Sequence, residues 1–204
     1  MADSMTGISA KDVAELRRRT GAGMMECKKA LAETGGDFDK ATEWLRAHGV
    51  ARADKRADRS ANQGLVEAYV HHAGNIGVLL ELNCETDFVA RTDDFKALAK
   101  DVAMHIAAAA PQAVSVDQLD PAAVEREKRI FTEQVAQEGK PEAVRARIVE
   151  GKLKKYFSEV VLLEQPFVKD DTRTVGEVVK AVSGKTGENV VVKRFVRFQL
   201  GESV

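Results

Sequence analysis

The pattern of apolar residues changes near residue 62, and this change limits the chain to a fold with separate helical and sheet-forming parts. Residues 51–62 are mostly Ala, Arg, Lys and Asp with almost no bulky apolar side chain, which is typical of a solvated linker. Residues 65–72 and 76–84 are then rich in side chains that favour strands. The connection between them, residues 73–75, contains Gly and Asn for the positive φ angles of a tight turn. We therefore predict a β-hairpin behind a linker.

Before the linker, glycine residues divide the sequence into three short helical segments. Ser9 and Asp12 form a capping box, which predicts that a helix begins at Ala10. Because glycine often follows the last residue of a helix, Gly49 is expected to end the third segment. The predicted helices run over residues 10–20, 24–34 and 38–48. Such a unit buries only a small core, so we predict a three-helix (UBA-like) module, of a size often used for recognition, over residues 1–50.

After the hairpin, the pattern indicates helices followed by one more strand. Alternation over residues 190–200 predicts a strand with one apolar face, formed by Val190, Val192, Val196, Phe198 and Leu200. Arg194 interrupts that face. The predicted helices between hairpin and strand cover residues 95–106, 121–138, 141–150 and 153–163 and a segment after Thr174. Residues 63–204 are thus expected to form an α+β core in which helices cover a small antiparallel sheet.

The charges of the chain nearly cancel. Lys and Arg number 31 and Asp and Glu number 32, so the formal net charge is −1. Affinity for a phosphate backbone grows with the number of Lys and Arg contacts, and this balance argues against direct nucleic-acid binding as the main role. Basic clusters do occur at residues 17–19, 52–59 and 152–155, so an RNA-associated helical and α+β protein is the alternative reading. The low aromatic content, 5%, offers few rings for stacking on bases.

Apolar runs and cysteines limit the cellular setting. The longest apolar runs are far shorter than the roughly 20 residues of a membrane-spanning helix, and residues 1–8 lack the features of a secretory signal or transit peptide. We therefore expect a cytoplasmic protein without a membrane contact. Cys27 and Cys84 are far apart and lack ligand spacing, which predicts reduced structural thiols rather than a zinc site or a disulfide. No metal or cofactor is predicted.

Two short patterns suggest catalytic or nucleotide-binding chemistry. Cys84 would be a thiol nucleophile if strand pairing brought His71 or His72 close to it as a base. Asp87 would then orient that base. The adjacent histidines point to opposite sides of a strand beside a turn, however, which favours an exposed pair. Residues 184–186, Gly-Lys-Thr, lack the earlier glycine of a phosphate-binding loop and follow a helical segment, so we reject a nucleotide site there and predict no catalytic residue.

The most unusual segment is the polar loop at residues 83–94, because it carries Phe88 and Val89 near its centre. An aromatic side chain in such a loop needs a partner. Phe88 either closes the top of the protein's own core or anchors the loop in another protein. Periodicity does not distinguish these two possibilities.

Several long segments resemble bacterial elongation factor Ts. They include RRRTGAGMMECKKAL at residues 17–31 and LNCETDFVA at residues 82–90. Further landmarks of that family follow in the same order at residues 151–160, 165–169, 174–176 and 195–198. The resemblance covers nearly the whole chain. It is to the family's short form, because longer members have two related core halves and an inserted helical hairpin.

This resemblance implies a guanine-nucleotide exchange factor without catalytic chemistry of its own. Members of the family bind elongation factor Tu, in its GDP-bound and nucleotide-free states, and release its GDP. Their Thr-Asp-Phe-Val loop enters the GTPase domain of elongation factor Tu and dislocates its Mg²⁺; the matching residues here are Thr86, Asp87, Phe88 and Val89. Phe88 would be the wedge, whereas Asp87 would cap a helix, pair with a partner cation or disturb the metal shell.

The resemblance also implies further contacts with the same partner. The helical head rests on the GTPase domain, and the residues that match the family's contact surface are Arg17, Met24 and Met25. The C-terminal part of the core would reach the partner's third domain. Short members work as homodimers, and a three-stranded sheet with open edges would gain from a second copy. We therefore expect a homodimer.

Overall fold

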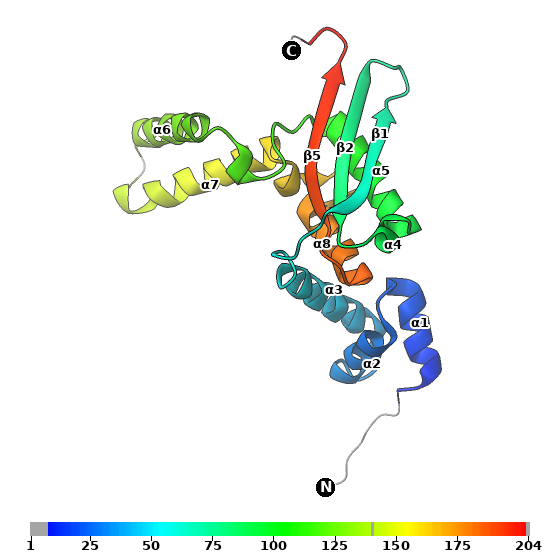
Figure 1. The fold of residues 1–204 in the computed structure, drawn as a ribbon. Coiled ribbons are helices and arrows are strands. Elements are labelled where there is room, and N and C mark those ends of the chain that lie inside the picture. Colours follow the sequence, from blue (N-terminus) through cyan, green and yellow to red (C-terminus); the bar gives the residue numbers. More distant parts are fainter. Residues whose placement is uncertain (1–7, 140, 203–204) are drawn as a thin grey trace.

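A helical head forms the N-terminal part of the protein (Figure 1). The computed structural model describes residues 8–139 and 141–202, and its head contains α1 (Ala10–Thr20), α2 (Met24–Glu33) and α3 (Phe38–Asp54). The Ser9 hydroxyl accepts the Asp12 N–H, and the Asp37 carboxylate caps α3. The head has its own small core, which includes Leu16, Cys27, Leu31, Ala41 and Leu45. All three predicted helices are confirmed; the UBA-like character stays a prediction, and residues 1–7 of the predicted module lie outside the described residues.

Helix α3 does not end at Gly49. It continues to Asp54, so the predicted boundary at residue 50 lies inside the helix, and the first four residues of the predicted linker are helical. Helix α3 crosses α8 (Val175–Thr186) closely, and Gly184 permits this crossing, because a Cβ on Gly184 would lie 3.2 Å from Gly49 Cα. A Cβ on Gly49 itself would meet no atom within 4 Å. An ion pair between Lys180 Nζ and Asp54 Oδ1, at 2.8 Å, joins the same helices.

A three-stranded antiparallel sheet lies at the centre of the core. Its order is β1 (Gln63–Val70), β2 (Ile76–Cys84) and β5 (Val191–Gln199), with β2 in the middle. Gly74, with φ at 69°, lies in the turn between β1 and β2. The predicted hairpin and last strand are therefore confirmed.

A β-bulge in β5 changes which of its side chains face the core. Leu82 pairs with Val192 and Glu81 pairs with Arg194, so Lys193 is an extra residue. Beyond it the alternation inverts, and Val196 and the residues that alternate with it turn away from the core. The prediction of a single inward face from Val190 to Leu200 is wrong for its second half. Arg194 belongs to the same outer face.

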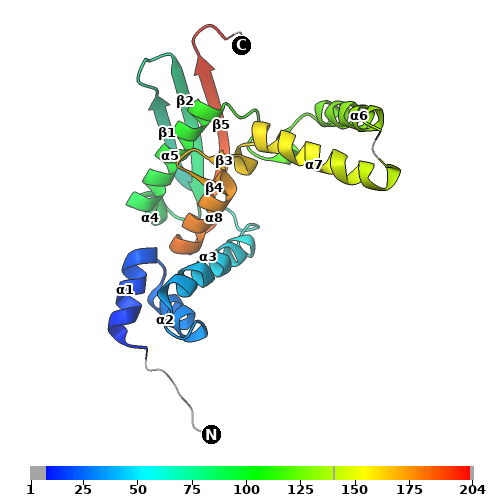
Figure 2. The ribbon, with the colours of Figure 1, turned by 180° about the vertical axis from the view of Figure 1, so that it is seen from behind.

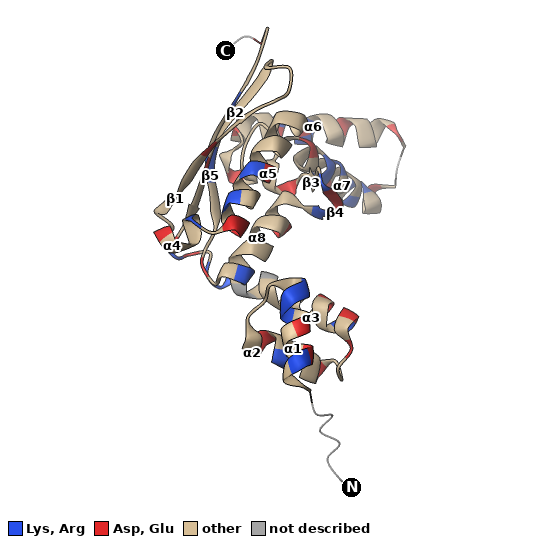
Figure 3. Cartoon of the chain, turned by 90° about the vertical axis from the view of Figure 1, so that its right-hand side faces the viewer, with Lys and Arg blue, Asp and Glu red and all other residues tan. Residues whose placement is uncertain are grey.

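Helices cover only one face of this sheet. These helices are α5 (Asp93–Ala109) and α8, which lie in front of the sheet in Figure 2, and Figure 3 shows both on the same side of the strands. The main apolar core lies between these helices and the strands, and it buries the predicted stripe of α5: Phe95, Leu98, Val102 and Ile106. Within residues 8–139 and 141–202, no element covers the opposite face.

A small hairpin that the sequence did not predict closes the core beside α5. It consists of β3 (Pro166–Phe167) and β4 (Asp170–Thr174). The buried His105 ring of α5 lies next to it and uses both nitrogens: Nε2 lies 2.9 Å from Gln165 Oε1, and Nδ1 lies 3.2 Å from the Val168 nitrogen. Because the Val168 N–H donates to Nδ1, the neutral ring carries its proton on Nε2.

Two antiparallel helices extend away from the sheet (Figures 1 and 2). They are α6 (Pro121–Gln137) and α7 (Glu142–Val160), and short 3-10 turns flank them at Val116–Gln118 and Leu162–Glu164. The predicted break at Gly151 does not occur, so the two helices expected there are one. Open space surrounds Gly151, and a single glycine costs a helix only about 1 kcal/mol relative to alanine.

Candidate partner-binding site

The polar loop after β2 contains a short helix that displays Phe88. This helix, α4 (Asp87–Ala90), is capped by Thr86, whose hydroxyl accepts the Val89 N–H at 3.5 Å. Ala90 is buried and Val89 packs on the main core, whereas the Phe88 side chain is 76% exposed. The loop is thus partly helical, and Phe88 does not close the protein's own core. It is a large apolar side chain held out into solvent by neighbours that point inward.

Asp87 is paired within the loop itself. Its Oδ2 accepts from Arg91 Nη2 at 2.7 Å, one helical turn later, and its carboxylate lies in the first turn of α4. Both side chains are exposed. The structure therefore accounts for Asp87 locally and leaves its carboxylate accessible to a partner cation.

Glu188 accepts hydrogen bonds from the first residues of this loop. This residue was not identified from the sequence. One carboxylate oxygen, Oε2, accepts the N–H groups of Glu85 and Thr86 at 3.1 and 3.0 Å, and Oε1 accepts the Thr86 hydroxyl at 2.6 Å. Residues separated by about a hundred positions meet here. No local sequence pattern predicts such a contact, because Glu188 resembles any polar residue in a turn before a strand.

The three head residues suggested by the sequence lie on either side of the turn between α1 and α2. Arg17 is exposed in the last turn of α1, and Met24 and Met25 in the first turn of α2 are 42% and 76% exposed. At Gly21, between them, an added Cβ would collide with Lys185 Cε. The structure thus presents a basic side chain on one side of a tight turn and two apolar side chains on the other side.

Lys185 connects this turn to the Phe88 region. Its Nζ donates to Asp94 Oδ1 at 2.7 Å, and Asp94 lies in the first turn of α5, directly after the Phe88 loop. Lys185 therefore lies between the Gly21 turn of the head and the start of α5, which follows the Phe88 loop in the sequence.

Several side chains of the basic clusters are paired within the chain. Glu15 binds both Arg18 and Arg19 at 2.8 Å, which lowers the pKa of its carboxyl group. In the other clusters, Arg59 pairs with Glu85, and Lys152 pairs with Glu138. Figure 3 shows positive and negative residues intermixed over the head and the core. Paired charges of this kind favour a mixed polar surface over a continuous phosphate-binding one.

The structure does not assemble the suggested thiol site. Cys84 ends β2 next to the Phe88 loop, whereas His71 and His72 lie beside the turn before β2, at the opposite end of that strand. The Cys84 thiol is buried and donates to the Thr86 carbonyl at 3.1 Å. Burial, and then the charge of Glu188, raise the pKa of this thiol, so its reactive thiolate form is disfavoured. Cys27 is also buried and free.

Neither a nucleotide loop nor a metal cluster is present in the described chain. Residues 184–186 form the C-terminal end of α8, not the start of a helix, and Lys185 is paired with Asp94. In residues 8–139 and 141–202, no three His, Cys, Asp or Glu side chains gather as metal ligands would. None of the helices in that part of the chain is long and apolar enough to cross a membrane.

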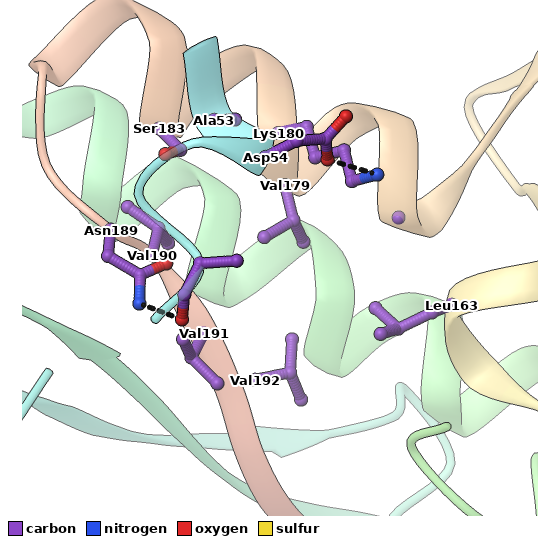
Figure 4. Close-up of a pocket in the computed structure, with 12 residues that line it drawn as sticks. Ala53, Asp54, Leu163, Val179, Lys180, Ser183, Asn189, Val190, Val191 and Val192 are labelled. Carbon is purple, nitrogen blue, oxygen red and sulfur yellow. Dashed lines mark hydrogen bonds and ion pairs between the residues drawn. The ribbon is translucent and has the colours of Figure 1, made fainter. Parts of the chain in front are cut away.

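One hollow at the junction of head and core is small and mainly apolar. It has a volume of about 190 Å³ and lies between the end of α3, α8 and the start of β5 (Figure 4). Its charged groups, Asp54 and Lys180, are already paired with each other. The hollow therefore marks the junction of head and core and offers few polar groups to a ligand.

Comparison with known proteins first gives the class: the similar proteins are elongation factors of translation. Elongation factor Ts of Desulforamulus reducens is 54% identical over 200 residues, covering 98% of this chain and 92% of the relative. Elongation factor Ts of Heliobacterium modesticaldum is 55% identical over 197 residues, covering 97% and 92%. That of Coprothermobacter proteolyticus is 53% identical over 195 residues, covering 96% and 99%.

The comparison with protein families then identifies the particular family. The family model described as "Elongation factor TS" matches residues 48–202. The chain belongs to the elongation factor Ts family, and the resemblance seen in its sequence is confirmed.

Proposed function

We propose that this chain is a cytoplasmic guanine-nucleotide exchange factor that binds elongation factor Tu and promotes release of its GDP. It would bind both the GDP-bound and the nucleotide-free partner, and it would act without catalytic residues, metal or cofactor of its own. The observation that carries this proposal is the exposed Phe88 side chain on a capped and braced loop. Family membership supports the translational setting.

The exposed phenylalanine suits the role of a wedge. A GTPase holds its nucleotide through Mg²⁺ and a backbone cradle around the phosphates, so moving those elements weakens the grip without breaking a covalent bond. Phe88 offers a large rigid surface at a low cost in side-chain entropy. Thr86 and Val89 would set its position, and Asp87 would add a negative charge beside it.

Release would follow from thermodynamic linkage. If the factor binds nucleotide-free elongation factor Tu more tightly than the GDP-bound form, factor and GDP weaken each other's binding by one shared coupling energy. Arg17, Met24 and Met25 would add affinity from the head, and their exposure around the Gly21 turn supports that role. The direct RNA-binding alternative gains no support, because many of the basic side chains are paired with carboxylates of the chain.

We also propose that two copies of the chain pair through the uncovered sheet face. Its outward side chains form rows across the strands, and the apolar ones are Val66, Ala68 and Val70 of β1, Leu79 of β2, and Val196 and Phe198 of β5. An apolar patch is complementary to itself, so a two-fold axis would bury both copies of it at once. The exposed fractions of Val66 and Phe198, 67% and 57%, show how much apolar surface a second copy would cover.

The exchange proposal is tested by replacing Phe88 with alanine. Release of a fluorescent GDP analogue from elongation factor Tu is followed without factor, with the intact protein and with the Phe88→Ala variant. We expect strong acceleration by the intact protein and loss of most of it in the variant, by about tenfold or more, as at an interface hot spot. Thermal unfolding should change little, because Phe88 is exposed.

A matched control is Ile130→Ala, which truncates a partly exposed apolar side chain on α6. This variant should accelerate release like the intact protein. Equal acceleration by Phe88→Ala would remove the wedge and keep the exchange function. No acceleration by the intact protein, with a cognate partner, would contradict the function itself.

The pairing proposal predicts that Leu79→Lys separates the two copies. Leu79 lies between Ala68 and Val196 in the middle of the outer face, and a buried unpaired ammonium there would oppose association. Light scattering should give the mass of two chains for the intact protein and of one for the variant. The control Val144→Lys places the same charge on α7 and should leave the mass unchanged. A concentration-independent mass of one chain for the intact protein would refute the homodimer.

A further inference from the structure

The turn between α8 and β5 ties together three segments that are distant in the sequence. Glu188 accepts three hydrogen bonds from the start of the Phe88 loop, two from backbone N–H groups and one from the Thr86 hydroxyl. Thr86 is also the residue that caps α4. One carboxylate therefore holds the residue on which the orientation of Phe88 depends.

Glu188 is itself held in place by its surroundings. Its carbonyl oxygen accepts the Ser183 hydroxyl of α8 at 2.6 Å. The next residue, Asn189, is buried and donates its side-chain N–H groups to the carbonyls of Ala57 and Arg59 at 3.1 and 2.8 Å. Figure 4 shows Asn189 beside the segment that joins the head to the sheet.

The same turn also binds the other carboxylate of this region. The Asn189 N–H donates to Glu85 Oε1 at 2.7 Å, and Arg59 lies 3.4 Å from the same oxygen. The turn, the head linker and the base of the Phe88 loop thus form one hydrogen-bonded network. Such a network holds the loop and the linker relative to each other, because the loop is bonded to Glu188 and Asn189 and the linker is bonded to Asn189.

We infer that Glu188 is a positioning residue for nucleotide exchange, which acts by holding the Thr86–Val89 loop in the orientation that presents Phe88. This inference rests on the proposed function. Hydrogen bonds to an ionised carboxylate are stronger than neutral ones, so a single side chain suffices to order the short loop. Without it, the loop would have to be ordered when the partner binds, and that cost would appear as lost affinity.

The inference predicts a local change in the free protein. In Glu188→Ala, the amides of Glu85 and Thr86 lose their acceptor, and their hydrogen exchange should accelerate by about tenfold or more. Core amides of α5 should keep their rates. The variant Glu188→Gln keeps the shape and one acceptor oxygen, so it should restore part of the protection. This measurement does not depend on any activity.

A double-mutant cycle separates positioning from general destabilisation. The factor concentration that gives half of the maximal GDP release rate should rise about tenfold or more for Glu188→Ala. In the Phe88→Ala background, the same substitution should have little further effect, because Glu188 acts through Phe88. Additive effects in the two backgrounds would overturn the inference.

Glu177→Ala is the matched control. Glu177 accepts the Thr174 N–H in the capping box of α8, so this variant also removes a bound carboxylate but leaves the Phe88 loop intact. It should change neither the loop amides nor the half-saturating concentration. If the intact protein accelerates release and Glu188→Ala does so equally well, the positioning role is wrong. If the intact protein does not accelerate release, the exchange function is wrong, and the hydrogen-exchange result alone decides whether Glu188 orders the loop.

Discussion

At the scale of single residues, His105 shows how burial selects a protonation state. Its ring is 1% exposed and is satisfied by Gln165 on one side and the Val168 N–H on the other. A proton on Nδ1 would break the second bond, because that nitrogen must accept. Burial accordingly lowers the pKa of His105 from its ordinary value of 6.5.

This depressed pKa predicts a loss of stability on acidification. Below pH 6.5 the unfolded chain binds a proton at residue 105 that the folded protein resists, so the free energy of unfolding falls as the pH falls through that value. One such proton contributes at most about 1.4 kcal/mol per pH unit. Urea unfolding at pH 7.5 and 5.5 measures the difference.

The contribution of His105 is isolated by two substitutions. His105→Gln should unfold more easily at both pH values but lose less stability between them. His72→Gln removes an exposed histidine and should keep the full pH dependence of the intact protein. An unchanged pH dependence in His105→Gln would show that other groups cause it.

The residues of the site differ in how far the sequence could predict them. An aromatic residue in a polar loop identifies Phe88 as a candidate, but its exposure depends on whether Val89 and Ala90 turn inward, which is decided by the core they meet. Glu188 could not be predicted. Its contacts are made by a chain reversal that brings the α8–β5 turn onto the Phe88 loop.

At the scale of elements, the sequence predicted where helices begin, but it did not predict whether a glycine ends a helix. The capping side chains of Ser9, Asp37 and Asp120 act within three residues of their own position, so the sequence contains the whole interaction. Gly49 and Gly151 look alike in the sequence, and both were expected to end a helix. Both helices continue through these glycines, and a Cβ at either position would meet no atom within 4 Å. The close α3–α8 crossing depends on Gly184 instead.

The environments of Gly184 and Gly151 predict opposite effects of a larger side chain. Gly184→Val would push its side chain into the backbone of α3 at Gly49, and overpacking of this kind costs about 1–3 kcal/mol. Gly151→Ala meets nothing within contact distance and should stabilise α7 by about 0.5–1 kcal/mol. Chemical denaturation of the two variants and the intact protein measures both signs. A stabilising Gly184→Val would show that α3 and α8 separate without cost.

At the scale of the whole molecule, the fold class followed from composition, but the relative placement of its parts did not. The linker and the change of periodicity near residue 62 were enough to predict a helical head and an α+β core. The contact of the head with α8 depends on Gly184, Lys180 and Lys185, and none of these has a recognisable pattern. The apolar character of the outer sheet face was also not predicted, because the sequence alternation of β5 does not reveal the bulge at Lys193.

The apolar cluster of the head and the main apolar core predict two levels of stability. The head cluster is smaller than the main core between sheet and helices, so the head should open more readily. Native-state hydrogen exchange in low denaturant should give lower opening free energies for amides around Leu31 than for those around Leu80. Equal opening energies would mean that the α3–α8 contact makes head and core unfold together.

The bulge in β5 also determines how the strand would tolerate the loss of a codon. In a regular strand, deletion of one residue moves every later side chain to the opposite face. In β5, Lys193 is already the surplus residue, so its deletion would leave Val192 opposite Leu82 and Arg194 opposite Glu81, with every later side chain on its present side. The same deletion a few positions later would send Phe198 inward. Loss of the codon for Lys193 would therefore keep the inward and outward alternation of β5, whereas loss of a later codon would invert it.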